Sequence, residues 1–456
     1  MKDDNRKGKL NWTRKNDDSS PGKNKPSGKK PFTSSTSSSS KSYPKKPKPE
    51  DRDPKKEKKP NMLHKQSNSH LPEKHFQMAA TCSQYLEDVL EKELKDLGAN
   101  NIKKAKRAVE FSGDLRLMYK ANIALRTALK VIKPLFFFTA KTENHLYNNI
   151  KEFEWEEIMG LEDTFSIDFA VHSSFFPHSQ YAALKMKDAI VDRFREKFGE
   201  RPSVQKKQPD FRFHIRVQES QVQISLDSSG DPLFKRGYRR STNIAPINET
   251  LAAGILLKSQ WDANSNFIDP MCGSGTFPIE AALLASNTPP NLHREYFGFE
   301  RWKDFDQKLL MDVLKELREK IKPIDFTIIA RDKNSESIRT ARENVHSAGF
   351  SRNIKIQQED MFQSKKPFGE GTMIFNPPYG ERIQLRDAAA FYATIGDSLK
   401  HDYTGLTTWI ISMDEQWIKE IGLKPAEKID LMNGNLHCKL VRYETFEGKR
   451  KEMLEK

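Results

Sequence analysis

The C-terminal part of the chain, from about residue 266 to residue 446, alternates short apolar segments with helical ones, and this rhythm constrains the fold most. Strands are expected in NFIDPM, FTIIARD, IKIQQED, TMIFNPP and GLTTWIISM, with helical patterns such as TFPIEAALLAS and SESIRTARENVHSAG between them. Strands that alternate with helices in this way predict a parallel, doubly wound α/β sheet.

Two strand-like runs flank Asn433-Gly434 near the C-terminus. An Asn-Gly pair between such runs is the strongest short signal for an antiparallel hairpin. A parallel sheet that ends in an antiparallel hairpin fits the Rossmann-like sheet of class I methyltransferases better than a nicotinamide-binding domain. We therefore expect residues 266–446 to form an α/β domain of that methyltransferase type.

Residues 75–230 follow a different pattern, which predicts an α+β region built of two small sheets with helices. A helix that ends at Gly199 is expected over YAALKMKDAIVDRFREKFG, and a helical stretch is expected through LMYKANIALRTALKVI. The alternating run FRFHIRVQESQVQISLDSSG predicts a β-hairpin. We divide this region at 75–140 and 141–230, and assign 231–265 to a linker with a helix.

The first 74 residues are rich in Lys, Pro and Ser and offer almost nothing apolar to bury, so they are expected to be disordered. Residues 1–70 carry 20 Lys and Arg against 8 Asp and Glu, while the whole chain has a net charge of +14. The basic character of the protein therefore comes mainly from this tail. It is either a solubilising extension or an electrostatic arm for nucleic acid.

Three cysteines, Cys82, Cys272 and Cys438, lie far apart without CxxC spacing, which argues against a disulfide framework and favours a reducing, cytoplasmic location. The eleven histidines show no ligand spacing, so no metal site is expected. No apolar run approaches the roughly 18 residues of a membrane span, and no signal-peptide core is present at the N-terminus.

The stretch FIDPMCGSGTFPIEAA places a strand end at Asp269 before a glycine loop that opens a helix. Glycines at 273 and 275 allow a ligand to approach the backbone, and the helix start at Thr276 presents free N–H groups. The spacing is neither G-x-G-x-x-G nor a P-loop, which disfavours dinucleotides and ATP. A tight turn that needs glycine is the alternative. Cys272 is interpreted as a small loop residue because no His partner is apparent.

Carboxylates also stand at the ends of the next two strands. Asp332 follows FTIIAR, where an acid can accept hydrogen bonds from a ribose diol, although it or Ser335 could instead cap the following helix. Asp360 follows IKIQQE, where it could accept from an adenine amine while Met361 packs on the ring. Each signal is weak when it stands alone.

The fourth strand runs into Asn376-Pro377-Pro378-Tyr379. Two prolines remove two backbone donors and fix two φ angles, so the strand must stop there. An exocyclic base amine is a poor nucleophile, and an Asn oxygen with a proline carbonyl can accept its N–H bonds and orient it. Tyr379 could stack on an extruded base. A simple Pro-rich turn is the alternative, but four motifs on successive strand ends favour a methyl-transfer site.

The segments DPMCGSGTFPIEAA, ARENVHSAG, NPPYGERI, FYATIGDSLK and LFKRGYRRSTNIAPINETLAA resemble those of bacterial 23S ribosomal-RNA guanine-N2-methyltransferases with a THUMP region. The resemblance runs from about residue 76 to residue 443. It implies a ferredoxin-like domain, a THUMP RNA-binding domain and a catalytic domain that uses S-adenosyl-L-methionine. It also implies that the target is guanine N2 in 23S rRNA, free or in a large-subunit assembly intermediate, and hence a role in rRNA processing.

By position, the resemblance carries roles to individual residues. Its cofactor residues are Asp269, Cys272, Gly273, Gly275, Thr276, Asp332, Asp360, Met361 and Asn376, and its target-base residues are Asn376, Pro377, Pro378 and Tyr379. Two positions depart from the family pattern. Asn334 stands where a second acid is common, so ribose binding is expected to depend on Asp332, and Asn248 stands where lysine is usual. Because the chain ends shortly after the hairpin, one activity is expected.

RNA contacts are expected from two basic clusters, although charged helix faces are commonly only solvated. The candidates are Lys185 and Arg193 on a THUMP helix, and Lys235, Arg236, Tyr238, Arg239 and Arg240 in KRGYRR. Three other functions are competing hypotheses: guanine-N2 methylation of tRNA, adenine-N6 methylation of DNA, and a non-catalytic role as an RNA-binding or ribosome-assembly factor. The sequence does not indicate an oligomeric state.

Overall fold

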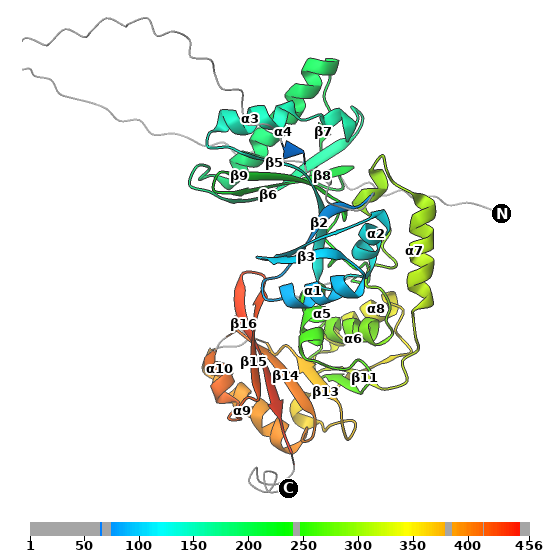
Figure 1. Ribbon diagram of the computed structural model, residues 1–456. Coiled ribbons are helices and arrows are strands. Elements are labelled where there is room, and N and C mark those ends of the chain that lie inside the picture. The colour runs from blue at the N-terminus through cyan, green and yellow to red at the C-terminus, as the bar shows by residue number, and fades with distance from the viewer. Residues whose placement is uncertain (1–63, 66–73, 240–246, 379–384, 414, 447–456) are drawn as a thin grey trace, which may run out of the picture. The chain divides into compact units, whose positions relative to one another are not determined.

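The computed structural model describes residues 64–65, 74–239, 247–378, 385–413 and 415–446 (Figure 1). Predictions that fall on Tyr379, on Arg240 and on most of the basic tail lie outside these residues. Within the predicted tail, His64–Lys65 forms the short strand β1, which pairs antiparallel with β5.

The N-terminal region is a single sheet, not two. Its described strands follow the order β3-β4-β2-β5-β9-β8-β6-β7, with β1 also on β5. The strands are β2 Phe76–Cys82, β3 Asn100–Ala105, β4 Ala108–Gly113, β5 Ala128–Thr139, β6 Thr164–His172, β7 Ser203–Val204, β8 Phe211–Gln218 and β9 Gln221–Asp227.

Strand β5 joins the two halves because it is long enough to pair with both. Its first residues pair with β2 up to Ile132, and the rest pairs with β9 from Ile132 to Thr139. The register shifts between Pro134 and Phe136, as expected where a proline cannot donate to the ladder. The predicted separation into two small sheets fails at this shared strand.

The predicted helix through LMYKANIALRTALKVI ends early. Helix α2 covers Leu115–Ala124, and β5 begins at Ala128. The carboxylate of Glu93 accepts the backbone N–H groups of Arg126 (2.6 Å) and Thr127 (3.1 Å), which holds the chain extended between the two elements. This partner lies 33 residues upstream, so helical periodicity alone could not reveal it.

Helices complete the N-terminal region. These are α1 Glu87–Asp96, α3 Glu143–Glu152 and α4 Ser179–Phe198, with the 3-10 turn η1 at Trp155–Glu157. Gly199 ends α4 in the left-handed conformation (φ +77°), as predicted for that glycine. Trp155 is fully buried and packs edge-on against Phe153 and Phe213.

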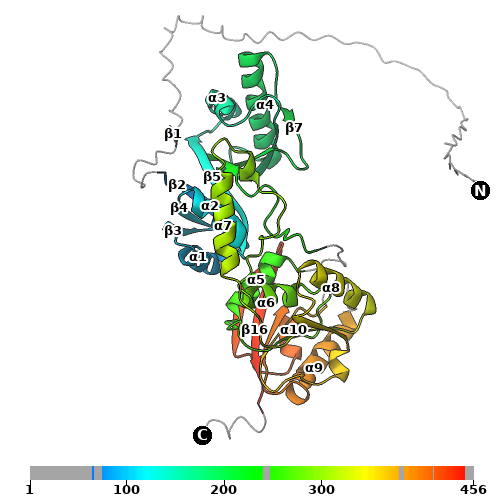
Figure 2. The same cartoon turned by 90° about the vertical axis from the view of Figure 1, so that its right-hand side faces the viewer.

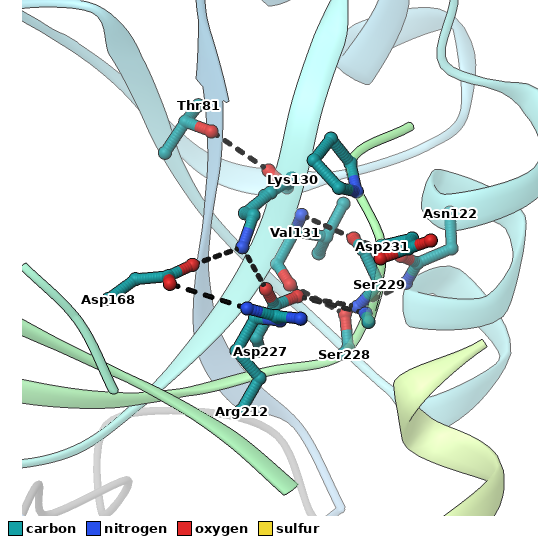
Figure 3. Close-up of polar contacts among 12 residues, drawn as sticks. Thr81, Asn122, Lys130, Val131, Asp168, Arg212, Asp227, Ser228, Ser229 and Asp231 are labelled. Atoms are coloured by element: carbon teal, nitrogen blue, oxygen red, sulfur yellow. Dashed lines mark hydrogen bonds and ion pairs between the residues drawn. The ribbon is translucent and has the colours of Figure 1, made fainter. Parts of the chain in front are cut away.

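A polar cluster links β5 to β9, β8 and β6 (Figure 3). The Lys130 ammonium lies 2.7 Å from both Asp168 on β6 and Asp227 on β9, and Arg212 on β8 also contacts Asp168. The Asp227 side chain is 1% exposed. A buried carboxylate at this position needs a cation, because an unpaired buried charge is strongly unfavourable.

The C-terminal domain contains a seven-stranded sheet in the order β12-β11-β10-β13-β14-β16-β15 among the described residues. The strands are β10 Phe267–Asp269, β11 Ile328–Asp332, β12 Ile354–Gln358, β13 Thr372–Phe375, β14 Thr407–Ser412, β15 Glu427–Asn433 and β16 Leu436–Glu444. The first five strands in this order are parallel, and β16 is antiparallel to β14 and β15. Gly434 turns the hairpin with φ +63°. The predicted parallel sheet with a terminal antiparallel hairpin is confirmed.

The helices of this domain are α5 Glu249–Lys258, α6 Thr276–Ala285, α7 Gln307–Glu319, α8 Ser335–Ser347, α9 Leu385–His401 and α10 Glu415–Glu420, with 3-10 turns η2 Gly298–Arg301 and η3 Met361–Gln363. Helices α5 and α6 lie side by side in both views (Figures 1 and 2). Asn248 caps α5, since its side chain accepts from the Thr250 N–H and hydroxyl. The unusual Asn248 therefore has a structural role at the helix start.

Candidate active site

Four polar side chains stand at the carboxyl ends of four adjacent strands. Asp269 ends β10, Asp332 ends β11, Asp360 follows β12 and Asn376 follows β13. Since these strands are parallel neighbours, their ends meet at one edge of the sheet, where open α/β sheets bind ligands. A cavity of about 630 Å³ lies there, and all four side chains line it.

Most of the residues predicted from the motifs line this cavity. They are Asp269, Cys272, Gly273, Thr276, Asp332, Asp360, Met361, Asn376 and Pro378. Two predicted residues do not line the cavity, although they belong to the same loops. Gly275 lies against α8, and Pro377 is buried.

The glycine loop has the backbone that its sequence requires. Gly273 and Gly275 adopt φ values of +53° and +82°, which side chains rarely tolerate. A Cβ on Gly275 would also lie 3.4 Å from the Ala341 side chain on α8. The loop is tied to the next strand because the Gly273 N–H donates to Asp332 Oδ2 at 2.9 Å.

The carboxylates at the ends of β11 and β12 retain free acceptor capacity. Asp332 accepts from the N–H groups of Gly273 and Asn334, one on each oxygen, both at 2.9 Å. A carboxylate has about four acceptor sites, so two are left for a ligand diol. Asp360 accepts from the Phe362 N–H through Oδ1 at 3.0 Å.

The cap of α8 is neither of the two residues considered from sequence. Asn334 accepts from the N–H groups of Glu336 and Ser337, at 2.8 and 3.1 Å. This frees Asp332 from the capping role and leaves its side chain at the cavity wall.

Asp269 and Cys272 are buried, and burial favours the neutral form of both side chains. Burial raises the pKa of Asp269 well above its ordinary value, with a further contribution from Asp332, although the Met271 N–H donates to its Oδ1 at 3.0 Å. Burial also raises the pKa of the Cys272 thiol, assisted by both aspartates. A protonated, buried thiol is a poor nucleophile, which agrees with the interpretation of Cys272 as a small loop residue.

Asn376 lines the cavity and carries an unused acceptor. Its Oδ1 atom is buried and has no hydrogen-bond partner among the described residues. A buried amide oxygen without a donor is costly and rare, so it points to a ligand that carries an N–H or O–H group. Pro377 and Pro378 follow directly and restrain the backbone that carries it.

Aromatic side chains that were not predicted form the apolar wall of the cavity. Phe362 and Phe391 line it and meet edge to face with ring centroids 5.3 Å apart. Phe277, the second residue of α6, also lines it. The segment EDMF placed Phe362 two residues after Asp360, so it could have been found, whereas Phe391 comes from α9 and has no local signal.

A side chain from the linker before α5 reaches the cavity wall. Arg239 donates to the Thr276 hydroxyl at 3.1 Å, to the Ile247 carbonyl at 3.1 Å and to Glu249 at 2.8 Å. Thr276 and Ile247 both line the cavity. The prediction of Arg239 as an RNA contact conflicts with this geometry, because its guanidinium is largely buried and holds these groups.

Two further residues of KRGYRR are buried and cannot meet RNA in this arrangement. The Tyr238 hydroxyl donates to Glu280 at 3.0 Å, and Arg236 donates to the carbonyls of Leu233 (2.7 Å) and Arg126. Burial raises the pKa of Tyr238 well above its ordinary value. The expectation that Tyr238 stacks on a base and that Arg236 contacts phosphate is corrected: both hold the junction together.

The two RNA-contact candidates on helix α4, Lys185 and Arg193, also make contacts within the protein. Arg193 donates through two nitrogens to Glu156 and through its third nitrogen to the Lys151 and Glu152 carbonyls, which is a structural arrangement. Lys185 lies over the Tyr181 ring and 3.9 Å from Glu143. Lys235 is 56% exposed and contacts only Asp231, four residues earlier, so it is the freest of the described candidates.

Among the described residues, no group of three or more His, Cys, Asp or Glu side chains is placed to hold a metal ion. The helices in that same part of the chain include none that is both long and apolar enough to cross a bilayer.

Three family models match consecutive parts of the chain. Residues 77–132 match the RlmL ferredoxin-like domain, residues 140–227 match the THUMP domain, and residues 236–442 match the RMKL-like methyltransferase domain. The matches cover the N-terminal sheet and the domain that carries the cavity.

Curated relatives and a solved structure are similar over most of the chain. The "Ribosomal RNA large subunit methyltransferase K/L" of Syntrophotalea carbinolica is 35% identical over 81% of this chain, and that of Marinomonas sp. is 33% identical over 83%. The chain spans about half the length of these relatives, 53% and 54%. The crystal structure of the methyltransferase SMU.472, solved with SAH, is 30% identical, with a TM-score of 0.73, over 83% of this chain and 100% of that one.

Proposed function

This chain belongs to the family of class I methyltransferases that carry ferredoxin-like and THUMP domains before an RMKL-like catalytic domain, and on that basis we propose that it methylates a base amine in ribosomal RNA. Its cofactor is S-adenosyl-L-methionine, which supplies an electrophilic methyl group on a sulfonium when bound. The residues that line the cavity of about 630 Å³ at the strand ends fit this cofactor.

The fit depends on donors and acceptors at three strand ends. Asp332 keeps acceptor sites for a ribose diol, and Asp360 keeps one oxygen for an adenine amine. The edge-to-face pair of Phe362 and Phe391, with the buried Met361, offers an apolar wall for a flat ring. Asp269 and the glycine loop line the remaining end, toward the start of α6, where the methionine part is expected.

The observation that carries the proposal is the unpaired Oδ1 of Asn376. An exocyclic amine is weakly nucleophilic because its lone pair is delocalised into the base. An acceptor fixed by the protein can hold one N–H group, orient the nitrogen toward the methyl donor and stabilise the positive charge that develops on it. The carbonyl of Pro377 is proposed to accept the second N–H group, and Tyr379, which lies outside the described residues, to stack on the base.

The proposed substrate is guanosine in 23S rRNA, methylated at N2. Two arguments support the rRNA part: the THUMP match and the relatives described as large-subunit rRNA methyltransferases. The choice of guanine N2 depends on the resemblance of the sequence motifs, since an Asn acceptor suits any exocyclic amine. Methylation of tRNA and a non-catalytic role in ribosome assembly are the alternatives.

The test compares modified nucleosides from 23S rRNA, 16S rRNA, tRNA and DNA of a strain with and without the gene, by mass spectrometry. Loss of N2-methylguanosine at one 23S position, restored by the wild-type gene, is the expected result. Loss of N2-methylguanosine in tRNA alone would identify tRNA as the substrate. Loss of N6-methyladenine in DNA would identify DNA as the substrate and adenine as the target base. An unchanged profile in every fraction would overturn the enzymatic proposal.

A further inference from the structure

A second cavity, of about 390 Å³, lies at the junction of the THUMP and methyltransferase regions. It shares no lining residue with the first cavity. Its wall comes from β8, from the segment after β9, from the loop that follows α6 and from the end of α8. The polar side chains that matter here are Arg212, Lys235, Arg236, His293, Arg294 and Tyr296.

The unpaired polar atoms on this wall are donors. Arg236 Nε and Arg212 Nε are both buried and have no hydrogen-bond acceptor among the described residues. The Arg236 side chain is 1% exposed, and its nearest carboxylate oxygen, Oε1 of Glu280, lies 3.6 Å from Nε. No buried side-chain acceptor on the described wall is left unpaired in this way. The unpaired buried atoms of this cavity wall are therefore donors, whereas the unpaired atom at the first cavity is the Asn376 acceptor.

Arg294 adds a positive charge that no carboxylate neutralises directly. Its guanidinium donates to the backbone carbonyls of Tyr296, Pro232, Ser229 and Asp231, at 2.5 to 3.2 Å. Among the described residues it forms no ion pair within 4 Å. Carbonyl contacts fix the guanidinium without cancelling its charge, so it attracts an anion that enters the cavity.

Arg212 has only a shared counter-charge. Its Nη1 lies 3.3 Å from Asp168, and the same carboxylate accepts from Lys130 at 2.7 Å. Asp227, the second carboxylate in that cluster, also contacts Lys130 (Figure 3). The two acidic side chains on the cavity wall, Asp231 and Glu295, do not contact Arg212 or Arg236.

Lys235 completes the cluster at the cavity mouth. Its side chain is 56% exposed, and its one contact among the described residues is the i,i+4 pair with Asp231 at 3.1 Å. Exposed pairs of this kind contribute little, so the ammonium can turn to a stronger anion at small cost.

We propose that this junction cavity binds a phosphodiester group of the substrate RNA through Arg212, Arg294 and Lys235. Phosphate oxygens are the acceptors that the unpaired Nε–H donor of Arg212 lacks, and arginine forks suit them. The proposal rests on the proposed function, because it requires an RNA substrate. Helix α6 runs from Thr276 at the first cavity to Leu283 at the second, about 10 Å along its axis. An RNA strand whose target base enters the first cavity could therefore place a neighbouring phosphate in the second cavity.

The test measures binding of the full chain to a labelled short oligouridylate by fluorescence anisotropy over a range of salt concentrations. Lys235→Ala is compared with Lys320→Ala, a matched control. Lys320 is 57% exposed and pairs with Glu316 four residues earlier at 3.0 Å, but it lines neither cavity. Removal of one phosphate contact should lower the salt slope by about 0.7 and the affinity by about fivefold near 0.1 M salt. Lys235→Glu should weaken binding further, Lys235→Arg should preserve it, and Lys320→Ala should change neither quantity.

Equal salt slopes for wild type, Lys235→Ala and Lys235→Glu would overturn the proposal. A rise in melting temperature in millimolar inorganic phosphate that is lost in Lys235→Glu, with RNA slopes unchanged, would assign the cavity to a free anion and overturn the RNA claim. Methyl transfer is not part of this assay, so the outcome is independent of the nucleoside analysis. If the wild-type protein methylates RNA but Lys235→Glu shows the wild-type salt slope, only the proposed phosphate site is refuted and the proposed function stands.

Discussion

Arg239 Nη2 donates to the Thr276 hydroxyl at 3.1 Å, although the two residues are 37 positions apart. The same side chain holds the Ile247 carbonyl and the Glu249 carboxylate. One guanidinium thus connects the linker after the THUMP region, the start of α5 and the first residue of α6. Thr276 and Ile247 line the first cavity, whereas Arg239 does not. The shape of that cavity therefore depends on Arg239 through its hydrogen bonds to these two residues.

We therefore expect Arg239→Ala to weaken S-adenosyl-L-methionine binding more than RNA binding. Thr276 loses the donor that orients it, which should raise the cofactor Kd about tenfold. The variant should also lose roughly 3 kcal/mol of unfolding free energy, because Glu249 is left buried without its cation. Calorimetric titration with the cofactor and denaturant melts provide the two measurements.

A double-mutant cycle with Glu249→Gln separates the two effects. The neutral amide removes the unpaired charge, so Arg239→Ala/Glu249→Gln should recover part of the stability but not the cofactor affinity. A Kd for Arg239→Ala within about twofold of wild type would show that Arg239 does not position Thr276.

Asn376→Ala should bind the cofactor normally and lose turnover. Its side chain lines the cavity, but its unpaired Oδ1 is assigned to the base amine. Loss of one oriented acceptor in an enclosed site costs about a hundredfold to a thousandfold in kcat. Cofactor Kd and single-turnover methylation of rRNA are measured on the same preparation. Turnover that survives within a few-fold would remove Asn376 from the amine-orienting role.

Some of the site could be predicted because its parts are local. Asp269, Asp332, Asp360 and Asn376 each end a short apolar strand, and parallel strands bring their ends together whatever the loops do. The hairpin at Asn433-Gly434 is specified by two residues. The same reasoning cannot find Phe391 on α9, because no nearby motif accompanies it.

Long-range pairing explains the remaining differences. Arg236 and Tyr238 look like exposed RNA contacts in KRGYRR, yet Tyr238 meets Glu280 42 positions later, and Arg236 meets the Arg126 carbonyl 110 positions earlier. Strand β5 similarly joins the two halves of the N-terminal sheet through β2 and β9, which lie on either side of it in sequence. Composition within a segment does not specify partners at such distances.

Asp269 should make the stability of the cofactor-free protein decrease with pH. Burial raises the pKa of its carboxyl, so the folded state holds the proton more tightly than the unfolded state does. The resulting stability is complete below the unfolded pKa, about 4, and is lost as pH rises through the raised folded value. Asp269→Asn keeps the acceptor for the Met271 N–H and cannot ionise.

The stability difference between Asp269→Asn and wild type should therefore move in favour of the variant from pH 5 to pH 8, as measured by urea denaturation. The exposed Asp312→Asn on α7 is the control and should track wild type. A difference that stays constant over this range would contradict a raised pKa at Asp269.

Lys130→Met should destabilise the N-terminal sheet strongly, because the Lys130 ammonium is the shared partner of Asp168 and Asp227 at 2.7 Å (Figure 3). The Lys130 side chain is 17% exposed and that of Asp227 is 1% exposed, so the substitution leaves a buried carboxylate unpaired. Losing one partner of such a pair costs about 3 to 5 kcal/mol. Lys104→Met, which removes a 53% exposed ammonium 3.3 Å from Glu91, should leave the melting temperature unchanged. If Lys130→Met/Asp227→Leu is more stable than Lys130→Met alone, the unpaired carboxylate is the cause; if the double variant is less stable, lost packing is the cause.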